Sequence, residues 1–291
     1  MIFTLHNEKI TLTVDSLGAQ MMSLKSSDGI EYLWQGNPEF WSDRAPILFP
    51  FIGRLTNNAY KYMGKVYPMT IHGFAATKEF VAVEKTQNRL VLELCSIPAI
   101  KENYPFDFSL KICYELTDAL VEITFRVENL GDNTMPFGIG GHPGFNVPLV
   151  EGEYFEDYEI EFSVPCCPDR VGFSPTVYMN GNDEIYHLRE ERFIDLRHDL
   201  FDEDAIILKN MAREVTLRSR ISGRGVQVTF PDLPYLGIWH WPKTDAPYAC
   251  IEPWSSLPSR QDIVEEFSCK SDLIQLAHNE RYETTWSIAV I

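Results

Sequence analysis

The chain has 291 residues, of which 45% are hydrophobic and 13% aromatic, and its formal net charge is -17 at pH 7. This apolar content is enough for one large core, and all-β sandwiches of this length commonly form a single domain. The acidic charge argues against nucleic acid and against an anionic membrane surface as partners, because both favour a basic protein surface. No run approaches the roughly 20 apolar residues of a membrane-spanning helix.

The amino-terminal residues 1–6 contain no basic region and no long apolar run, so the sequence predicts no signal peptide. Six cysteines are present, at positions 95, 113, 166, 167, 250 and 269, and none form a C-x-x-C pair. This spacing argues against zinc ribbons and thioredoxin-like motifs. We therefore expect reduced thiols and a cytoplasmic location.

Apolar and polar residues alternate in several segments of the chain. In chain order these segments are residues 10–14, 90–94, 106–115, 120–128 and 226–230. Within residues 120–128 the apolar positions that would share one face are Val121, Ile123, Phe125 and Val127. A period of two is typical of strands with one buried and one polar face, as in antiparallel sheets.

Helical periodicity is scarce, and no alternation of strand and helix is visible, which argues against Rossmann and TIM-barrel architectures. Turn signals such as Asp28-Gly29 and Asn180-Gly181 separate the strand-like segments. Residues 150–200 are the least regular, and we expect long connections there. The sequence predicts an all-β fold in which residues 1–291 form a single domain, a large antiparallel β-sandwich.

A glycine-rich segment, Gly138 to Phe145 with the sequence GIGGHPGF, surrounds one histidine, His142. It does not match a dinucleotide-binding loop, because Pro143 stands where a third glycine is required and no helical pattern follows. A P-loop also requires a lysine that is absent here. Two interpretations are left: a catalytic histidine at the end of a strand, or an ordinary turn histidine.

His72 lies in a similar setting, in the segment MTIHGFA, and like His142 it is closely followed by glycine and phenylalanine. A rigid sheet could present either side chain from a strand end, although a turn histidine is the alternative for both. His240 lies between Trp239 and Trp241. It is either a packed core histidine or a site residue.

The segment from Tyr248 to Trp254 contains a carboxylate, Glu252, on the same predicted strand face as Tyr248 and Cys250. A carboxylate on an apolar and aromatic face is costly to bury unless it is paired or functional. The alternative is a strand-end glutamate that points to solvent. Pro253 follows directly and predicts the end of the strand.

Aromatic residues lie close in sequence to these candidates, namely Phe74, Phe145, Trp239, Trp241 and Trp254. Aromatic faces beside polar groups suit sugar rings, although core packing is the common role of such residues.

Two histidines and a carboxylate could also hold a metal ion. Because no closely spaced ligand pair such as H-x-x-x-H occurs, we expect no metal.

Three segments together resemble the aldose 1-epimerase (galactose mutarotase) family. They occur in the family's order, as Gly53-Arg54-Leu55 to Ile71-His72-Gly73, then Gly141 to Asn146, then Cys250-Ile251-Glu252. The resemblance extends over nearly the whole chain. It implies a large antiparallel β-supersandwich that interconverts the α and β anomers of an aldohexose. It also implies a small-molecule sugar as partner and no cofactor, and it leaves open whether the protein is a monomer or a homodimer.

The same resemblance implies roles for individual residues. Glu252 would be the general base, His142 the general acid and His72 a second active-site histidine. Arg54 and Asp204 would bind sugar hydroxyl groups. We also expect Trp239 and Phe145 to contact the substrate.

The chain departs from the family pattern beside each of these motifs. Phe74 follows His72-Gly73 where a second glycine is usual, Gly144 replaces a common tyrosine, and Pro253-Trp254 follows the glutamate in place of Thr-Gln. These departures imply a divergent branch and leave the identity of the sugar open.

Three rival functions remain at this stage. A hexose-6-phosphate 1-epimerase would need a basic cluster for the phosphate, for which Arg54 and Arg260 are candidates. A non-catalytic carbohydrate-binding protein could use the same aromatic residues. A glycoside hydrolase would need two carboxylates flanking the scissile bond, and only Glu252 stands out.

Overall fold

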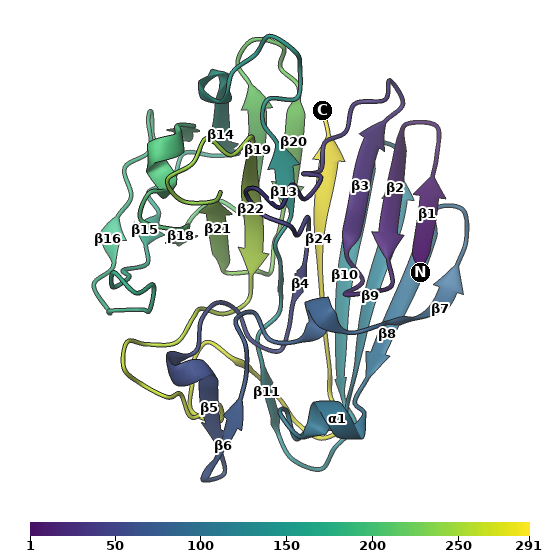
Figure 1. Cartoon of the computed structure of the whole chain (residues 1–291), viewed down its shortest axis with the longest axis vertical. Coiled ribbons are helices and arrows are strands. Elements are labelled where there is room, and N and C mark those ends of the chain that lie inside the picture. The colour runs from purple at the N-terminus through teal and green to yellow at the C-terminus, as the bar shows by residue number, and fades with distance from the viewer.

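The computed structural model describes residues 1–291, and every pair of neighbouring strands in its sheets is antiparallel (Figure 1). The larger of two extended sheets has nine strands. In spatial order these are β17 (Phe193–Asp195), β14 (Tyr158–Phe162), β19 (Glu214–Ser219), β20 (Gly225–Thr229), β24 (Arg281–Val290), β10 (Leu120–Asn129), β9 (Phe108–Thr117), β8 (Arg89–Cys95) and β7 (Val81–Lys85).

The second extended sheet has eight strands and carries most of the candidate residues. In spatial order these are β16 (Glu184–Ile185), β15 (Asp169–Arg170), β18 (Ile206–Lys209), β21 (Tyr235–Trp239), β22 (Tyr248–Trp254), β12 (Gly140–Gly141) and β4 (Ile47–Leu48), with β13 (Gly144–Asn146) also paired to β22. Strand β22 is therefore central, with neighbours on both sides.

Smaller elements complete the chain. Three strands at the amino terminus form their own sheet: β1 (Ile2–His6), β2 (Ile10–Asp15) and β3 (Met21–Ser26). Two-stranded sheets are formed by β5 (Ala59–Tyr62) with β6 (Lys65–Pro68), and by β11 (Met135–Phe137) with β23 (Ile274–Leu276). The helices are short: α1 (Pro98–Lys101), η1 (Thr56–Asn58), η2 (Ala75–Thr77), η3 (Phe155–Asp157) and η4 (His198–Phe201). None of them has the length and apolarity required to cross a lipid bilayer.

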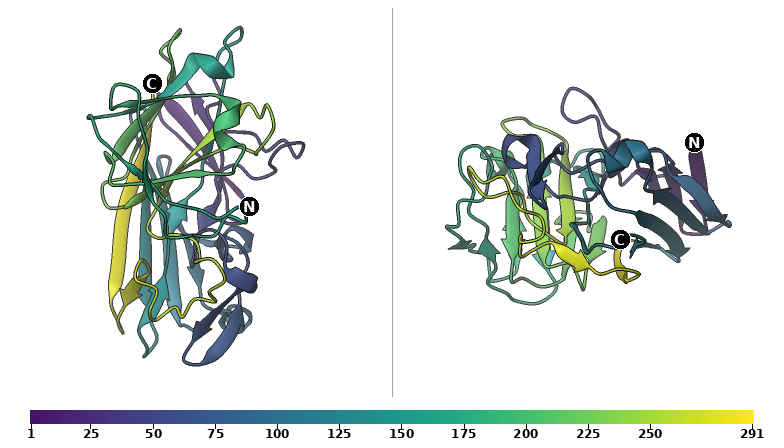
Figure 2. Two further views of the ribbon diagram at one scale, coloured as in Figure 1. Left: turned by 90° about the vertical axis from the view of Figure 1, so that its left-hand side faces the viewer. Right: turned by 90° about the horizontal axis from the view of Figure 1, so that it is seen from below.

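A continuous core of 66 buried residues includes side chains from both extended sheets, among them Phe125 of β10, Ile238 of β21 and Trp286 of β24. Alternation creates this core, since along β10 every second residue is buried, starting from Val121. The side view in Figure 2 shows β24, drawn in yellow, along one side of the molecule. The predicted all-β fold of antiparallel sheets is thus confirmed.

Two local expectations differ from the structure. Residues 150–200 include a regular strand, β14, whose YEIEF sequence pairs with both β17 and β19. Strand β22 does not end at Pro253 but continues to Trp254. The amides of Ile251 and Ser255, on either side of Pro253 in sequence, donate hydrogen bonds to the segment 139–143. Because proline has no amide proton, only the one hydrogen bond that residue 253 would donate to this segment is missing.

Candidate active site

Strand β22 separates core residues from candidate site residues by alternation. Ala249 and Ile251 belong to the main core, whereas Tyr248, Cys250 and Glu252 point to the opposite face of the sheet, as predicted. Glu252 lies between Gly237 of β21 and the segment that contains His142. The central strand thus holds this carboxylate on a rigid support.

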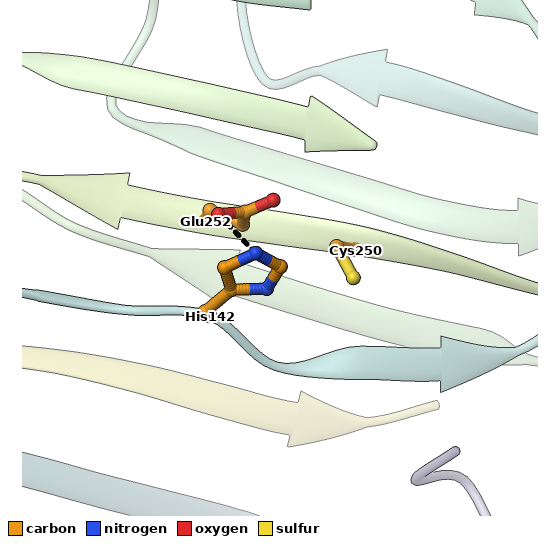
Figure 3. Close-up of side chains that lie close together, drawn as sticks. All are labelled: His142, Cys250 and Glu252. Atoms are coloured by element: carbon orange, nitrogen blue, oxygen red, sulfur yellow. Dashed lines mark ion pairs between the residues drawn. The ribbon is translucent and has the colours of Figure 1, made fainter. Parts of the chain in front are cut away.

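His142 lies directly across from Glu252. Gly140 pairs with Trp254 and Gly144 pairs with Cys250, so the register on either side places His142 opposite the glutamate. Side chains at such cross-strand positions on one face are close neighbours. The Nε2 atom of His142 lies 3.2 Å from an Oε2 atom of Glu252 (Figure 3).

The segment that joins β12 to β13 carries His142 and contains the glycine-rich sequence. Gly141 packs so tightly that an added Cβ would lie 2.6 Å from the ring of Trp286. The amide of His142 donates to Pro46, and the carbonyl of Pro143 accepts from the amide of Ile251. The glycines therefore allow close packing, and backbone hydrogen bonds fix the segment on both sides.

Aromatic rings surround His142. The ring centroid of Trp41 is 4.9 Å from that of His142, and those of Trp239 and His72 are each 5.5 Å away. His142 is only 7% exposed and Glu252 1%. Neither the Nδ1 atom of His142 nor the Oε2 atom of Glu252 has a hydrogen-bond partner. The pair is therefore enclosed almost entirely by apolar groups.

This enclosure moves the pKa values of the pair in opposite directions. Burial, with a smaller contribution from the nearby Asp204, raises the pKa of Glu252 well above its usual value of 4.5. Burial and the neighbouring His72 lower the pKa of His142 well below 6.5. Both shifts favour uncharged groups, so the pair holds a single proton over a range of pH.

His72 is fixed by Gly53 through two hydrogen bonds. The amide of Gly53 donates to the Nδ1 atom of His72 over 3.1 Å, and the amide of His72 donates back to the carbonyl of Gly53 over 3.0 Å. Burial and the charge of Arg54 lower the pKa of His72 to about 4. The neutral ring therefore carries its proton on Nε2, where it can donate a hydrogen bond.

Arg54 and Asp204 form an ion pair beside the histidines. The Nη2 atom of Arg54 lies 3.4 Å from the Oδ2 atom of Asp204, and both side chains are partly exposed. Asp204 has a left-handed backbone with φ of 79°, and His72 has one with φ of 63°. Such conformations are uncommon outside glycine and concentrate at functional sites.

The pair of His142 and Glu252 lines one cavity of about 590 Å³, within the range of small-molecule sites. The candidate polar residues in its wall are Arg54, His72, His142, Asp204 and Glu252. The aromatic residues in its wall are Trp41, Phe173, Trp239, Trp241 and Trp254. Residues that are distant in sequence are therefore brought together in the predicted combination.

Comparisons with known proteins agree with this arrangement. The sequence profile of the family described as Aldose 1-epimerase matches residues 1–288. The chain belongs to the aldose 1-epimerase family. Protein LacX (plasmid) of Lactococcus lactis subsp. lactis is 40% identical over 265 residues, 88% of either chain.

Solved structures of family-like proteins are similar throughout. A galactose mutarotase related enzyme from Lactobacillus acidophilus is 33% identical with a TM-score of 0.95, covering 100% of this chain and 97% of its own. A galactose mutarotase-like protein from Lactobacillus casei ATCC 334 is 30% identical with a TM-score of 0.94, covering 100% of both chains.

Within this epimerase-family site, some sequence predictions need correction. Phe145 is 1% exposed, lies in the main core and does not line the cavity, so its predicted contact with substrate is wrong. Phe145 pairs with Ala249, a core position of β22, so the register turns its side chain to the same buried side. Phe74 likewise packs against the core, with its ring 6.0 Å from that of Phe49.

His240 is a packed core histidine and not a cavity residue. It is fully buried, and its Nδ1 atom donates to the carbonyl of Trp241 over 2.8 Å. Its Nε2 atom lies 3.1 Å from Nδ1 of His198. Arg260 also lies outside the cavity wall, and its guanidinium donates two hydrogen bonds to Glu265, of 3.0 and 2.7 Å. The basic cluster considered for a phosphate is therefore not formed by Arg54 and Arg260.

Sequence reasoning missed Trp41 and Asp43, which both line the cavity. Their segment, residues 37–46, is a connection without alternation, so no strand face predicts where its side chains point. One signal was present: Phe40-Trp41 is an aromatic pair in a polar connection, with no strand to bury it. Burial raises the pKa of Asp43, the third carboxyl group of the cavity.

One group of side chains could hold a metal ion. Donor atoms of His142, Cys250 and Glu252 all lie within 4.8 Å of one another (Figure 3). Metals bind the thiolate form of cysteine, and burial raises the pKa of the Cys250 thiol, which disfavours that form. The absence of a metal therefore stays a prediction from the sequence.

Proposed function

We propose that this protein is an aldose 1-epimerase that interconverts the α and β anomers of a free aldohexose. The observation that carries the proposal is the buried pair of Glu252 and His142, 3.2 Å apart, in the wall of an aromatic cavity. Opening a pyranose requires one proton to leave the anomeric hydroxyl and one to reach the ring oxygen. Two adjacent groups that share one proton can exchange both.

The roles of the pair follow from this requirement. Once the proton of the pair has moved to His142, Glu252 removes the proton from the anomeric hydroxyl while His142 delivers one to the ring oxygen. The carbon–carbon bond next to the aldehyde then rotates, and the ring closes with the opposite configuration as the two groups exchange roles. The Nε2 proton of His72 and the side chains of Arg54 and Asp204 hold the sugar hydroxyls, and the faces of Trp239 and Trp254 contact its C–H groups.

The rival assignment to a hexose 6-phosphate has less support. Arg54 is paired with Asp204, and Arg260 is paired with Glu265 away from the cavity. A phosphate would have to compete with these carboxylates for its cations. Free glucose or galactose would meet no such competition, because sugar hydroxyls can accept from the arginine and donate to the aspartate at once.

The test is anomer exchange measured by NMR or polarimetry on freshly dissolved α-glucose and α-galactose. We expect the Glu252→Gln variant to lose about 10²–10⁴-fold in rate, because an amide cannot accept the proton. Glu8→Gln, a change at an exposed glutamate without partners, is the matched control. Melting curves would establish that both variants fold. Full activity of the Glu252→Gln variant, or an inactive wild-type protein that still binds sugar, would refute the proposal.

A further inference from the structure

Trp254 contributes to the cavity wall from the same strand as Glu252, two positions further along β22. The alternation of a strand places both side chains on the same face of the sheet. Trp254 is only 4% exposed. Its ring packs in a small apolar cluster with Leu48, Ile52, Val171, Ile207 and Leu257. The side chains of this cluster offer the indole N–H group no acceptor.

The side chains of Trp254 and Glu252 each end in a buried polar atom without a hydrogen-bond partner. These atoms are Nε1 of Trp254 and Oε2 of Glu252. Buried polar groups in folded proteins are nearly always hydrogen-bonded, so both atoms require an explanation. An indole N–H group can only donate, and an ionised carboxylate can only accept. The two unpartnered atoms are therefore complementary once Glu252 is ionised.

Two glycines on the neighbouring strands allow the indole ring to approach the carboxyl group. A Cβ added to Gly140 of β12 would lie 2.8 Å from Cδ1 of Trp254, and one added to Gly237 of β21 would lie 3.1 Å from Cζ2. Nε1 lies between these two atoms on the ring, so the edge that carries the N–H group crosses β22 from one glycine to the other. The same Cβ at Gly237 would lie 3.4 Å from the carboxyl carbon of Glu252. The N–H edge of the ring thus lies beside the carboxyl group.

We propose that Trp254 is a positioning residue of the acid–base pair, and that its indole N–H group donates a hydrogen bond to the Glu252 carboxylate once the proton of the pair has moved to His142. This inference rests on the proposed epimerase function. The hydrogen bond stabilises the charged form of the pair, which is the form that takes the anomeric proton of the sugar. The indole keeps its own proton throughout, so the proton balance of the reaction is unchanged.

The pKa of Glu252 reflects the same contact. Burial and, to a smaller extent, Asp204 raise this pKa, whereas the N–H group of Trp254 lowers it. The other titratable and charged groups around the carboxylate are His142, Asp204, Tyr248 and Cys250, and in the rest of the cavity wall Asp43, Arg54 and His72. None of these groups is removed when Trp254 is replaced by phenylalanine.

The test is the pH dependence of anomer exchange in the Trp254→Phe variant, which keeps an aromatic ring and loses the N–H group. Without the hydrogen bond the pKa of Glu252 rises further, so the alkaline limb should move up by about one pH unit. The charged form of the pair becomes rarer, and kcat should fall about 3–10-fold. The acid limb belongs to His142 and should stay in place. Trp241→Phe, at another tryptophan of the cavity wall, is the matched control and should leave the alkaline limb at its wild-type pH.

The position of the alkaline limb separates a hydrogen bond from simple packing. Loss of packing alone would lower kcat or weaken substrate binding without moving this limb. An alkaline limb that stays at the wild-type pH in the Trp254→Phe variant would therefore overturn the inference, whatever the value of kcat.

A second measurement needs neither a sugar nor a folded Trp254→Phe variant. It follows the NMR signal of the Trp254 indole N–H proton, assigned through its backbone, as the pH is raised. This signal should move downfield as Glu252 ionises in the wild-type protein and stay in place in the Glu252→Gln variant. A signal that stays fixed in the wild-type protein, or that moves equally in both proteins, would overturn the inference. If no sugar is interconverted, the epimerase proposal fails, and this titration still tests the hydrogen bond.

Discussion

Glu252 and His142 are individually unusual, but their chemistry depends on their being a pair. Each is buried, and burial moves each toward its uncharged form, raising the pKa of the glutamate and lowering that of the histidine. The two groups lie 3.2 Å apart, and in their uncharged forms the pair has one titratable proton, which lies on Glu252. This is the state from which one proton can be given and another taken in the same step.

A bell-shaped dependence of kcat/KM on pH follows from this single shared proton. On the acid side the pair gains a second proton at His142, and because its pKa is lowered this limb lies below pH 6.5. On the alkaline side the pair loses its proton from Glu252, and because that pKa is raised this limb lies above pH 4.5. The two limbs report apparent values of the pair.

The profile is measured by polarimetry, with the spontaneous rate in buffer subtracted at each pH. An acid limb above pH 6.5 would contradict the lowered pKa of His142. The absence of an alkaline limb would show that the reaction does not depend on the proton that the pair carries.

At the scale of elements, the segment 70–75 positions His72 through a glycine. Gly73 has a left-handed backbone with φ of 77°, and a Cβ at this position would lie 2.2 Å from the carbonyl oxygen of Phe49. That oxygen accepts hydrogen bonds from the amides of Phe74 and Ala75. The glycine thus permits a close approach on which the whole segment depends.

We expect Gly73→Ala to destabilise the protein by more than about 1 kcal/mol, because it combines left-handed strain with a backbone clash. It should also lower kcat/KM, since His72 must move with the segment. Gly64→Ala is the matched control, because Gly64 has φ of 75° and nothing within 4 Å of an added Cβ. Thermal unfolding and anomer exchange are measured for both variants. Equal stability and activity of the two variants would contradict the role assigned to the close approach.

The elements also show what the sequence could and could not predict. Alternation along β10 predicts that Phe125 lies in the core, and alternation along β22 predicts that Glu252 lies on the sheet face away from the core. Both predictions are possible because, in a strand with a period of two, fixing the face of one residue fixes the face of all the others. The same reasoning failed for Phe145, since a strand of three residues between loops has no pattern long enough to fix its face. Trp41 and the left-handed conformation of Asp204 depend on tertiary contacts, which no local pattern encodes.

On the scale of the whole molecule, the two extended sheets build the site together. Trp286 of β24 lies under Gly141, the residue before His142, so the nine-stranded sheet supports the segment of the eight-stranded sheet that carries His142. The cavity itself opens on the other face of the eight-stranded sheet, and the segments that contain Trp41, Arg54 and His72 complete its wall. The core thereby fixes the positions of His142 and Glu252, and the loops that complete the cavity wall determine which ligands can reach these two residues.

The net charge of -17 acts on every substrate that approaches this site. A neutral sugar experiences no net force, whereas glucose 6-phosphate is repelled over a distance set by salt. This distance falls from about 30 Å at 0.01 M to about 8 Å at 0.15 M ionic strength. We therefore expect kcat/KM for glucose 6-phosphate to be below that for glucose and to rise with added salt, while the value for glucose stays constant.

Anomer exchange of both sugars across this range of sodium chloride measures the effect. The sign of the salt dependence decides between the two substrate classes. A phosphate bound by local cations would lose affinity as salt is added, so a falling kcat/KM for glucose 6-phosphate would restore the hexose-6-phosphate assignment. A rising value means that the field of the whole chain acts against the phosphate, as expected for a site whose Arg54 is already paired with Asp204.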